Sequence, residues 1–173
     1  GFRSVFIKVL TTRILMFLAG AVIFGIISGV SLYIAHKVSS GPEEIPLPPQ
    51  IRDVLMRLIT WGTVGGAVVL SIIFGVVAAG QWEIFLRFSS ASDFGIADPL
   101  YSRDVAFYVF DMPMYEFLQG WLLAAVFVTL LATLGIYFVN FSYRGVGLQL
   151  TPGIKAQVSI LAALAMFIFG AGL

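Results

Sequence analysis

The 173-residue sequence contains no cysteine, a single histidine and few charged residues, which make up 11% of the chain. Without cysteine there is no thiol nucleophile, no thiolate metal ligand and no disulfide. One histidine and no cysteine also exclude a zinc cluster supplied by this segment alone. The net charge of +1 provides no basic surface of the kind that binds nucleic acid. Redox, zinc and nucleic-acid functions are therefore not predicted.

The low share of charged residues is matched by a high share of hydrophobic residues. They make up 60% of the chain, against roughly 45–50% in ordinary globular proteins. A soluble fold of this size would have too little polar side chain to cover so much apolar surface. The sequence therefore predicts a protein whose main solvent is the lipid bilayer.

Long uncharged runs divide the chain into membrane spans. About 20 helical residues cross a hydrocarbon core of roughly 30 Å, and a helix satisfies its own backbone groups within one segment. We predict an all-α membrane protein, a polytopic helical bundle, with residues 1–173 forming a membrane-domain fragment. The predicted spans lie near residues 14–35, 58–80, 117–140 and 157–173. The charged residues are expected in the connections, where the positive-inside rule gives a tie between the two sides.

Paired glycines suggest how these spans pack. Gly25 and Gly29 lie one turn apart on the first span, and Gly62 and Gly66 lie one turn apart on the second. Small residues at this spacing allow a neighbouring backbone to approach closely. The connection between the two spans, residues 39–49, contains four prolines and is expected to be extended.

The connection at residues 82–116 is the most informative part of the sequence. It is long for a simple link, which favours structure of its own. Trp82, Phe85 and Phe88 are spaced as on an interfacial helix. Asp98-Pro99 has turn chemistry, and residues 105–110 have strand-like composition. We therefore predict an aromatic-rich loop with structure of its own.

The loop aspartates and the single histidine are the groups that could carry chemistry. Four loop aspartates have suitable oxygen ligands for Ca²⁺, but their spacings of five, six and seven do not match the alternate-residue pattern of a calcium loop. Asp98 is expected to cap the turn, and Arg103 to pair with Asp104. His36, at the edge of the first span, is interpreted as an interfacial side chain rather than an axial cofactor ligand. We predict no catalytic, cofactor-binding or metal-binding residue. An enzyme that acts at the membrane surface through the acidic loop and a domain outside this segment is the least favoured function, because no paired acid/base or nucleophile arrangement stands out.

The loop carries a set of motifs that resembles the signature of a prokaryotic membrane family, the uncharacterised protein family 0182. These motifs are Phe94-Gly95, Asp98-Pro99, Arg103-Asp104, Phe107-Tyr108-Val109-Phe110, Pro113 and Gly120-Trp121-Leu122-Leu123. Three positions depart from the commoner pattern: Ala106 replaces a usual Ser, Met112 replaces a usual Leu, and Gln157 lies near a position often held by His.

The resemblance implies a protein several times longer, with about seven spans followed by a large extracytoplasmic domain. It also implies that the loop at 82–116 faces outside the cell. The family brings no catalytic residues, because it has no established activity. The loop motif is therefore interpreted as structural or partner-binding through Asp98, Pro99, Arg103, Asp104, Phe107, Tyr108, Phe110, Pro113 and Trp121.

Two functions remain in competition at the level of sequence. The first is a structural, anchoring or accessory subunit of a larger cell-envelope assembly in the cell membrane, with protein partners that include the missing parts of its own chain. The alternative is a transporter or a lipid-handling permease component. The predicted spans carry no charge, so ion coupling through this part is disfavoured, while passage of lipids or apolar solutes is not.

Overall fold

The computed structural model describes residues 2–39, 48–92, 94–96, 98–99, 101–144 and 151–172. Within them the elements are α1 (Phe2–Ser39), α2 (Pro49–Gly80), α3 (Trp82–Ser89), the π-helical turn η1 (Phe107–Asp111), α4 (Met112–Arg144) and α5 (Pro152–Gly170). The four helices α1, α2, α4 and α5 are long and apolar enough to cross a membrane. The predicted all-α polytopic bundle is confirmed.

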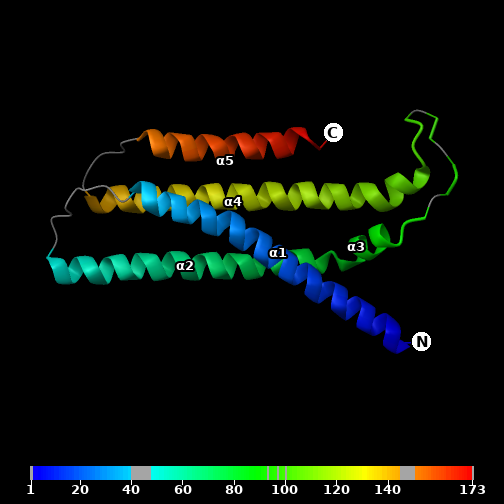
Figure 1. Cartoon of the computed structure of the whole chain (residues 1–173), viewed down its shortest axis with the longest axis horizontal. Helices are drawn as coiled ribbons and strands as arrows, with labels where there is room; N and C mark the ends of the chain where they lie inside the picture. Colours follow the sequence, from blue (N-terminus) through cyan, green and yellow to red (C-terminus); the bar gives the residue numbers. More distant parts are fainter. Residues whose placement is uncertain are drawn as a thin grey trace.

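Three of the long helices run alongside one another, and the fourth crosses them. In Figure 1, α2, α4 and α5 lie nearly parallel in projection, while α1 passes obliquely across α2 and α4. The start of α1, all of α3 and the start of α4 lie at one end of the bundle, here called the α3 end. The end of α1 and the starts of α2 and α5 lie at the opposite end, here called the Lys155 end.

The helices extend further than the uncharged runs. α1 has 38 residues and is about 57 Å long at 1.5 Å per residue, well beyond a hydrocarbon core of about 30 Å. Arg3, Lys8 and Arg13 therefore lie on α1, and the prediction that charges fall only in the connections is wrong. A charged side chain does not interrupt a helix; it marks where the helix leaves the hydrocarbon.

The start of α2 has a clear local cause. The helix begins at Pro49, a position where proline is tolerated because its missing N–H would have no intrahelical partner. Residues 50–57, which precede the predicted second span, are thus part of α2. Of the extended connection predicted at residues 39–49, Ser39 lies in α1 and Pro49 in α2. Residues 40–47 lie outside the described residues.

A buried aromatic cluster joins α1, α2 and α4 towards the α3 end. The rings of Phe24 and Phe74 are stacked with centroids 4.1 Å apart, and Trp121 meets Phe74 edge-on at 5.5 Å. All three side chains are buried. The Trp121 indole N–H also donates a hydrogen bond to the Phe74 carbonyl oxygen at 3.2 Å. Trp121, predicted as part of the loop motif, thus lies in the helix core.

Close helix packing occurs where α1 crosses α2. A Cβ atom added to Gly20 would lie 2.7 Å from the Ala78 Cβ, and one added to Gly75 would lie 2.8 Å from the Phe17 carbonyl oxygen. Neither position has room for a side chain. The two backbones therefore approach as closely as small residues allow.

The glycines expected to perform this role behave differently. A Cβ at Gly25 would lie 3.4 Å from Ser71 Oγ, an ordinary contact. At Gly29, Gly62 and Gly66 no neighbouring atom of the described residues would lie within 4 Å. The close packing predicted at these three positions is not found within the described part of the chain. One-turn spacing identifies a smooth helix face, but the crossing geometry decides which smooth face meets a neighbour.

Candidate functional site

The carboxylate of Asp104 organises the segment between α3 and α4. It accepts backbone hydrogen bonds from Ala106 at 2.8 Å, Gly95 at 2.8 Å and Phe94 at 3.2 Å. The hydrogen bond from Ala106, followed by those from Gly95 and Phe94, lowers the pKa of Asp104 below its ordinary value. Because helical backbone begins at Val105, Asp104 is the N-cap of the helical stretch that leads into α4.

The cap explains why residues 105–110 do not form the strand that their composition suggested. Helical backbone runs from Val105 through η1 into α4. The aromatic side chains of Phe107, Tyr108 and Phe110 pack against other rings, and strand propensity mostly reflects such packing rather than an intrinsic backbone preference. The strand-like interpretation is therefore wrong.

Backbone hydrogen bonds between described residues form a small hairpin between Phe94 and Ala106. The Asp98 N–H donates to the Arg103 carbonyl at 2.7 Å, and the Val105 N–H donates to the Ile96 carbonyl at 3.0 Å. The turn is closed by the Ser102 N–H, which donates to the Asp98 carbonyl at 2.8 Å. Ser102 has a φ of 54°, in the left-handed region that a tight turn requires. The predicted turn at Asp98 and Pro99 is thus present.

The side chains of the turn find partners on the following helix. One carboxylate oxygen of Asp98 accepts a hydrogen bond from the Tyr108 hydroxyl at 3.0 Å. The Arg103 guanidinium lies 4.5 Å from the centroid of the Phe107 ring, a cation–π contact. The predicted pairing of Arg103 with Asp104 is therefore wrong. Adjacent residues of an extended strand point to opposite faces, and the Asp104 carboxylate faces the backbone N–H groups.

Aromatic contacts fasten the hairpin to α3 and α4. Phe94 lies 5.7 Å from Phe110, measured between ring centroids. Tyr115 on α4 lies 6.3 Å from both Phe107 and Phe88, so one ring links η1 to α3. The interfacial helix that the spacing of Trp82, Phe85 and Phe88 predicted is α3. These contacts make the hairpin, α3 and the start of α4 a single connected unit.

Several apolar side chains of the hairpin and of η1 are exposed. Tyr101 and Ile96 are 70% and 64% exposed, and three other apolar side chains of these two segments are also exposed. We call this set of exposed residues the hairpin face: Phe94, Ile96, Tyr101 and Val105, together with Val109 of η1. Pro99 is exposed and lies at the turn, and Pro113 is half-buried in the first turn of α4.

Sequence reasoning missed a buried polar network deeper in the bundle. The Tyr137 hydroxyl donates to Gln157 Oε1, and Gln157 Nε2 donates to the Ser31 carbonyl at 2.7 Å and to Ser31 Oγ at 3.0 Å. Ser31 Oγ lies 2.9 Å from Thr133 Oγ1. The network joins α1, α4 and α5, and all four side chains are buried. Its only signal in the sequence was a few polar residues within apolar runs.

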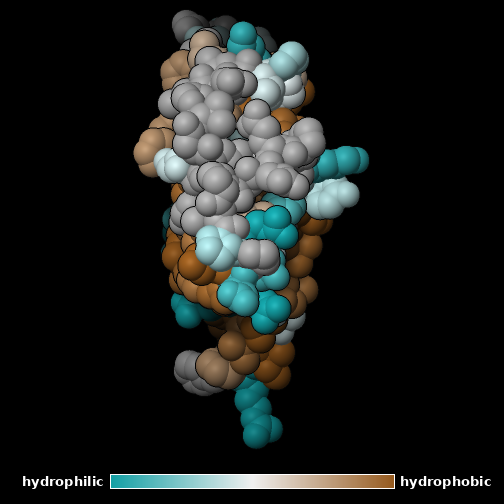
Figure 2. All heavy atoms as spheres, turned by 90° about the vertical axis from the view of Figure 1, so that its left-hand side faces the viewer, coloured by the Kyte–Doolittle hydropathy of each residue, from teal (hydrophilic) through white to brown (hydrophobic). Residues whose placement is uncertain are grey.

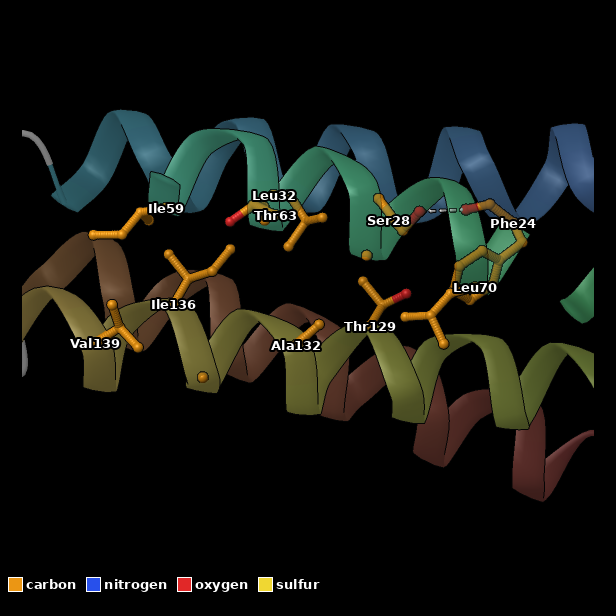
Figure 3. Close-up of a pocket in the computed structure, with 14 residues that line it drawn as sticks. Phe24, Ser28, Leu32, Ile59, Thr63, Leu70, Thr129, Ala132, Ile136 and Val139 are labelled. Carbon is orange, nitrogen blue, oxygen red and sulfur yellow. Dashed lines mark hydrogen bonds between the residues drawn. The ribbon is translucent and has the colours of Figure 1, made fainter. Parts of the chain in front are cut away.

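A cleft opens between α2 and α4, with α1 forming its floor. Figure 3 shows Ile59, Thr63 and Leu70 of α2 facing side chains of α4 across it. Its volume is about 390 Å³. Gly62, Gly66 and Gly135 are among the lining residues, and no lining residue is charged. The hydroxyls of Ser28 and Thr129 donate to carbonyls of their own helices at 2.8 Å, so the walls are mainly apolar.

Comparison with known proteins decides the family. The model of the Uncharacterised protein family (UPF0182) matches residues 1–173, the whole chain. The chain belongs to UPF0182. The resemblance inferred from the loop motifs is confirmed.

Several UPF0182 relatives are similar along nearly the whole chain. A UPF0182 protein of Rhodococcus opacus is 33% identical over 170 residues, covering 94% of this chain and 17% of the relative. One from Mycobacterium bovis is 34% identical over 173 residues, with coverage of 94% and 17%. One from Thermobifida fusca is 30% identical, covering 93% and 16%. The chain therefore spans about a sixth of the length of these relatives. No solved structure matches it significantly.

The UPF0182 signature residues fall into two places in the structure. Those from Asp98 to Pro113 come together in the hairpin and the first turns of the helix that follows it. Trp121 lies apart from them, in the core between α2 and α4. His36 is exposed near the end of α1. The signature thus marks a folded hairpin and the helix that supports it.

Proposed function

We propose that this UPF0182 region anchors a larger cell-envelope protein in the cell membrane, and that the hairpin face binds a protein surface outside the cell. The first partner is the remainder of the same polypeptide. The observation that carries this proposal is the exposed apolar hairpin face, which lies beyond the start of α4.

The position of the hairpin relative to the bilayer supports a protein partner. Asp111 and Glu116 flank the start of α4, and charged side chains are costly inside hydrocarbon. The hairpin precedes both residues, so it lies at or above the lipid headgroups. Apolar side chains such as Tyr101 and Ile96 would there be exposed to water, and clustered exposed apolar residues mark interaction sites.

The rigidity of the hairpin also suits binding. Asp104 fixes three backbone N–H groups, and the ring contacts tie the hairpin to α3. A surface that is already ordered loses less conformational entropy when a partner binds. A relative in which this chain is about 17% of the length has ample further sequence to supply the partner surface.

Site-specific photocrosslinking in intact cells tests this proposal. A photoreactive amino acid is placed at Tyr101 or Ile96 of the full-length protein, and at Phe167 as the control, an exposed apolar residue of α5. We expect the two hairpin positions to form protein adducts and the control to form lipid adducts. Peptide mapping separates crosslinks within the chain from crosslinks to a second protein. Lipid adducts alone at both hairpin positions would refute the proposal.

Lipid handling is the second candidate, and the cleft between α2 and α4 favours it. The cleft is apolar and of a size typical of small-ligand sites. Replacing Gly66 and Gly135 with leucine would fill it without displacing neighbours, because no neighbouring described atom lies within 4 Å of either Cβ position. If the protein handles lipids, vesicles containing it exchange fluorescent lipid between leaflets, and the double variant abolishes this exchange. Exchange no faster than in protein-free vesicles rules the function out.

A further inference from the structure

A second hollow lies at the Lys155 end, away from both the hairpin and the cleft. Its volume is about 530 Å³, and both α4 and α5 contribute to it. It is lined by Leu134, Tyr137, Phe138, Phe141, Ile154, Lys155, Val158 and Ser159. We call it the α4–α5 groove.

The walls of the groove suit a hydrocarbon chain. Most lining residues are aliphatic or aromatic, and the hydroxyl of Tyr137 is already used by Gln157. Phe138 is 64% exposed and Leu134 is also exposed, so the groove is open along the outside of the bundle. Its interior is supported by Ile154 and Tyr137, which belong to a buried cluster with Ala35 of α1. The groove is therefore a built feature that faces lipid.

The polar end of the groove suits an anion. Lys155 is exposed and lies in the first turns of α5, where the helix dipole also favours negative charge. Among the described residues, no carboxylate lies within ion-pairing distance of it. Ser159, one turn further along α5, adds a hydroxyl to the same wall.

Further basic residues lie at the same end of the bundle as Lys155. Figure 2 views the bundle from the Lys155 end and shows hydrophilic residues gathered there, with hydrophobic surface along the helices. The described basic residues at this end include Lys37 of α1 and Arg52 and Arg57 of α2. The described acidic residue there, Asp53, has a carboxylate oxygen 3.8 Å from Arg52 Nε.

We propose that the α4–α5 groove binds an anionic phospholipid, with its phosphate beside Lys155 and one acyl chain along Phe138 and Val158. The charge selects the headgroup, and the apolar walls select a lipid over free inorganic phosphate. Basic pockets between membrane helices bind anionic lipids in this way. The site is independent of the hairpin, so it stands whether or not the hairpin face has a protein partner.

Photoactivatable lipids test the site directly. The full-length protein is reconstituted in vesicles that contain either phosphatidylglycerol or phosphatidylcholine carrying a photoreactive acyl chain, and labelled peptides are quantified by mass spectrometry. We expect phosphatidylglycerol to label the 134–159 region more strongly than phosphatidylcholine. Lys155→Gln should reduce this preference roughly fivefold, the factor expected for one lysine at a membrane surface, and Lys155→Arg should retain it.

Two controls make the result decisive. Lys37→Gln removes a basic residue from the same end but not from the groove, so it should leave the labelling preference unchanged. Added inorganic phosphate should compete weakly, because it cannot occupy the apolar walls. Equal labelling by the two lipids in the parent protein would overturn the proposal. Equal effects of Lys155→Gln and Lys37→Gln would overturn it as well, since the preference would then reflect surface charge in general.

Discussion

The indole N–H of Trp121 on α4 donates a hydrogen bond to the main-chain carbonyl of Phe74 on α2, across 3.2 Å. The bond lies at the point where both helices also meet Phe24 of α1. Leu70, one turn before Phe74 on α2, lines the cleft, so the bond lies close to one end of it. Trp121 thus holds together two helices that are separated by the cleft further along.

Substitutions at Trp121 separate the contribution of its hydrogen bond to stability from the contribution of its buried ring. Trp121→Phe keeps a buried ring but removes the donor, and should cost about 1 kcal/mol of stability. Trp121→Ala also removes the ring, and should cost about 3–5 kcal/mol. Unfolding of the full-length protein in detergent measures both. Trp61→Ala, at a residue that is 71% exposed, is the control and should change stability by less than about 0.5 kcal/mol. Equal stability of all three variants would show that the contact of Trp121 with Phe74 does not stabilise the protein.

Because α1 crosses α2 closely at some glycines and not at others, we expect valine substitutions at these glycines to differ in their effect on stability. Gly75→Val forces a side chain against the Phe17 carbonyl oxygen and should destabilise the protein by about 1–3 kcal/mol, as overpacking does. Gly66→Val is the matched control on the same helix, since no neighbouring atom of the described residues lies within 4 Å of its Cβ position. The same unfolding assay measures both. A larger effect at Gly66 would mean that α2 packs through its other face, against segments beyond this chain.

The buried network predicts coupling between helices. Gln157→Leu removes the amide that accepts from Tyr137 and donates to Ser31, and should cost about 1–2 kcal/mol, since buried groups lose their partners. Adding Tyr137→Phe should then cost less than it does alone, because its partner is already absent. A double-mutant cycle in the unfolding assay measures this. Strictly additive effects would exclude the coupling. Ser159→Ala, on the exposed face of α5, serves as the single-site control.

The spans were predictable because hydrocarbon excludes charge, and that exclusion is visible in a sequence as a run without charges. The helix starts were not predictable in the same way. Arg13 ends the uncharged run but not the helix, which continues to Phe2. The strand-like composition of residues 105–110 was misleading, because Asp104 accepts a hydrogen bond from the Ala106 N–H and so caps a helix that begins at Val105.

Contacts between distant segments account for most of what sequence reasoning missed. The turn at Asp98 and Pro99 was predictable, because its chemistry is local. The hydrogen bond from Tyr108 to Asp98 and the contact between Arg103 and Phe107 depend on how the hairpin folds onto η1. Gln157 reaches Ser31 across 126 positions of the chain. No spacing rule connects residues that meet only after the helices have assembled.

Asp104 makes the hairpin sensitive to acid. Its pKa is lowered from the ordinary value of 3.8, first by the hydrogen bond from Ala106 and then by those from Gly95 and Phe94. A carboxylate whose folded-state pKa is lowered stabilises the fold at pH values above the ordinary value. That contribution is lost as the pH falls through the lowered folded value. The hairpin should therefore loosen below pH 3.8, while the membrane helices remain folded.

Hydrogen exchange of the hairpin amides checks this prediction. Protection at Gly95 and Ala106, corrected for the intrinsic rate at each pH, should fall as Asp104 becomes protonated. Asp104→Asn should give lower protection at neutral pH and remove most of the pH dependence, because the amide carries no titrating proton and its nitrogen cannot accept these bonds. Asp53→Asn, on α2 and far from the hairpin in the chain, should retain the parent response. If Asp104→Asn instead keeps the full acid response, another group controls the opening of the hairpin, and the three backbone hydrogen bonds to Asp104 are not what holds it closed.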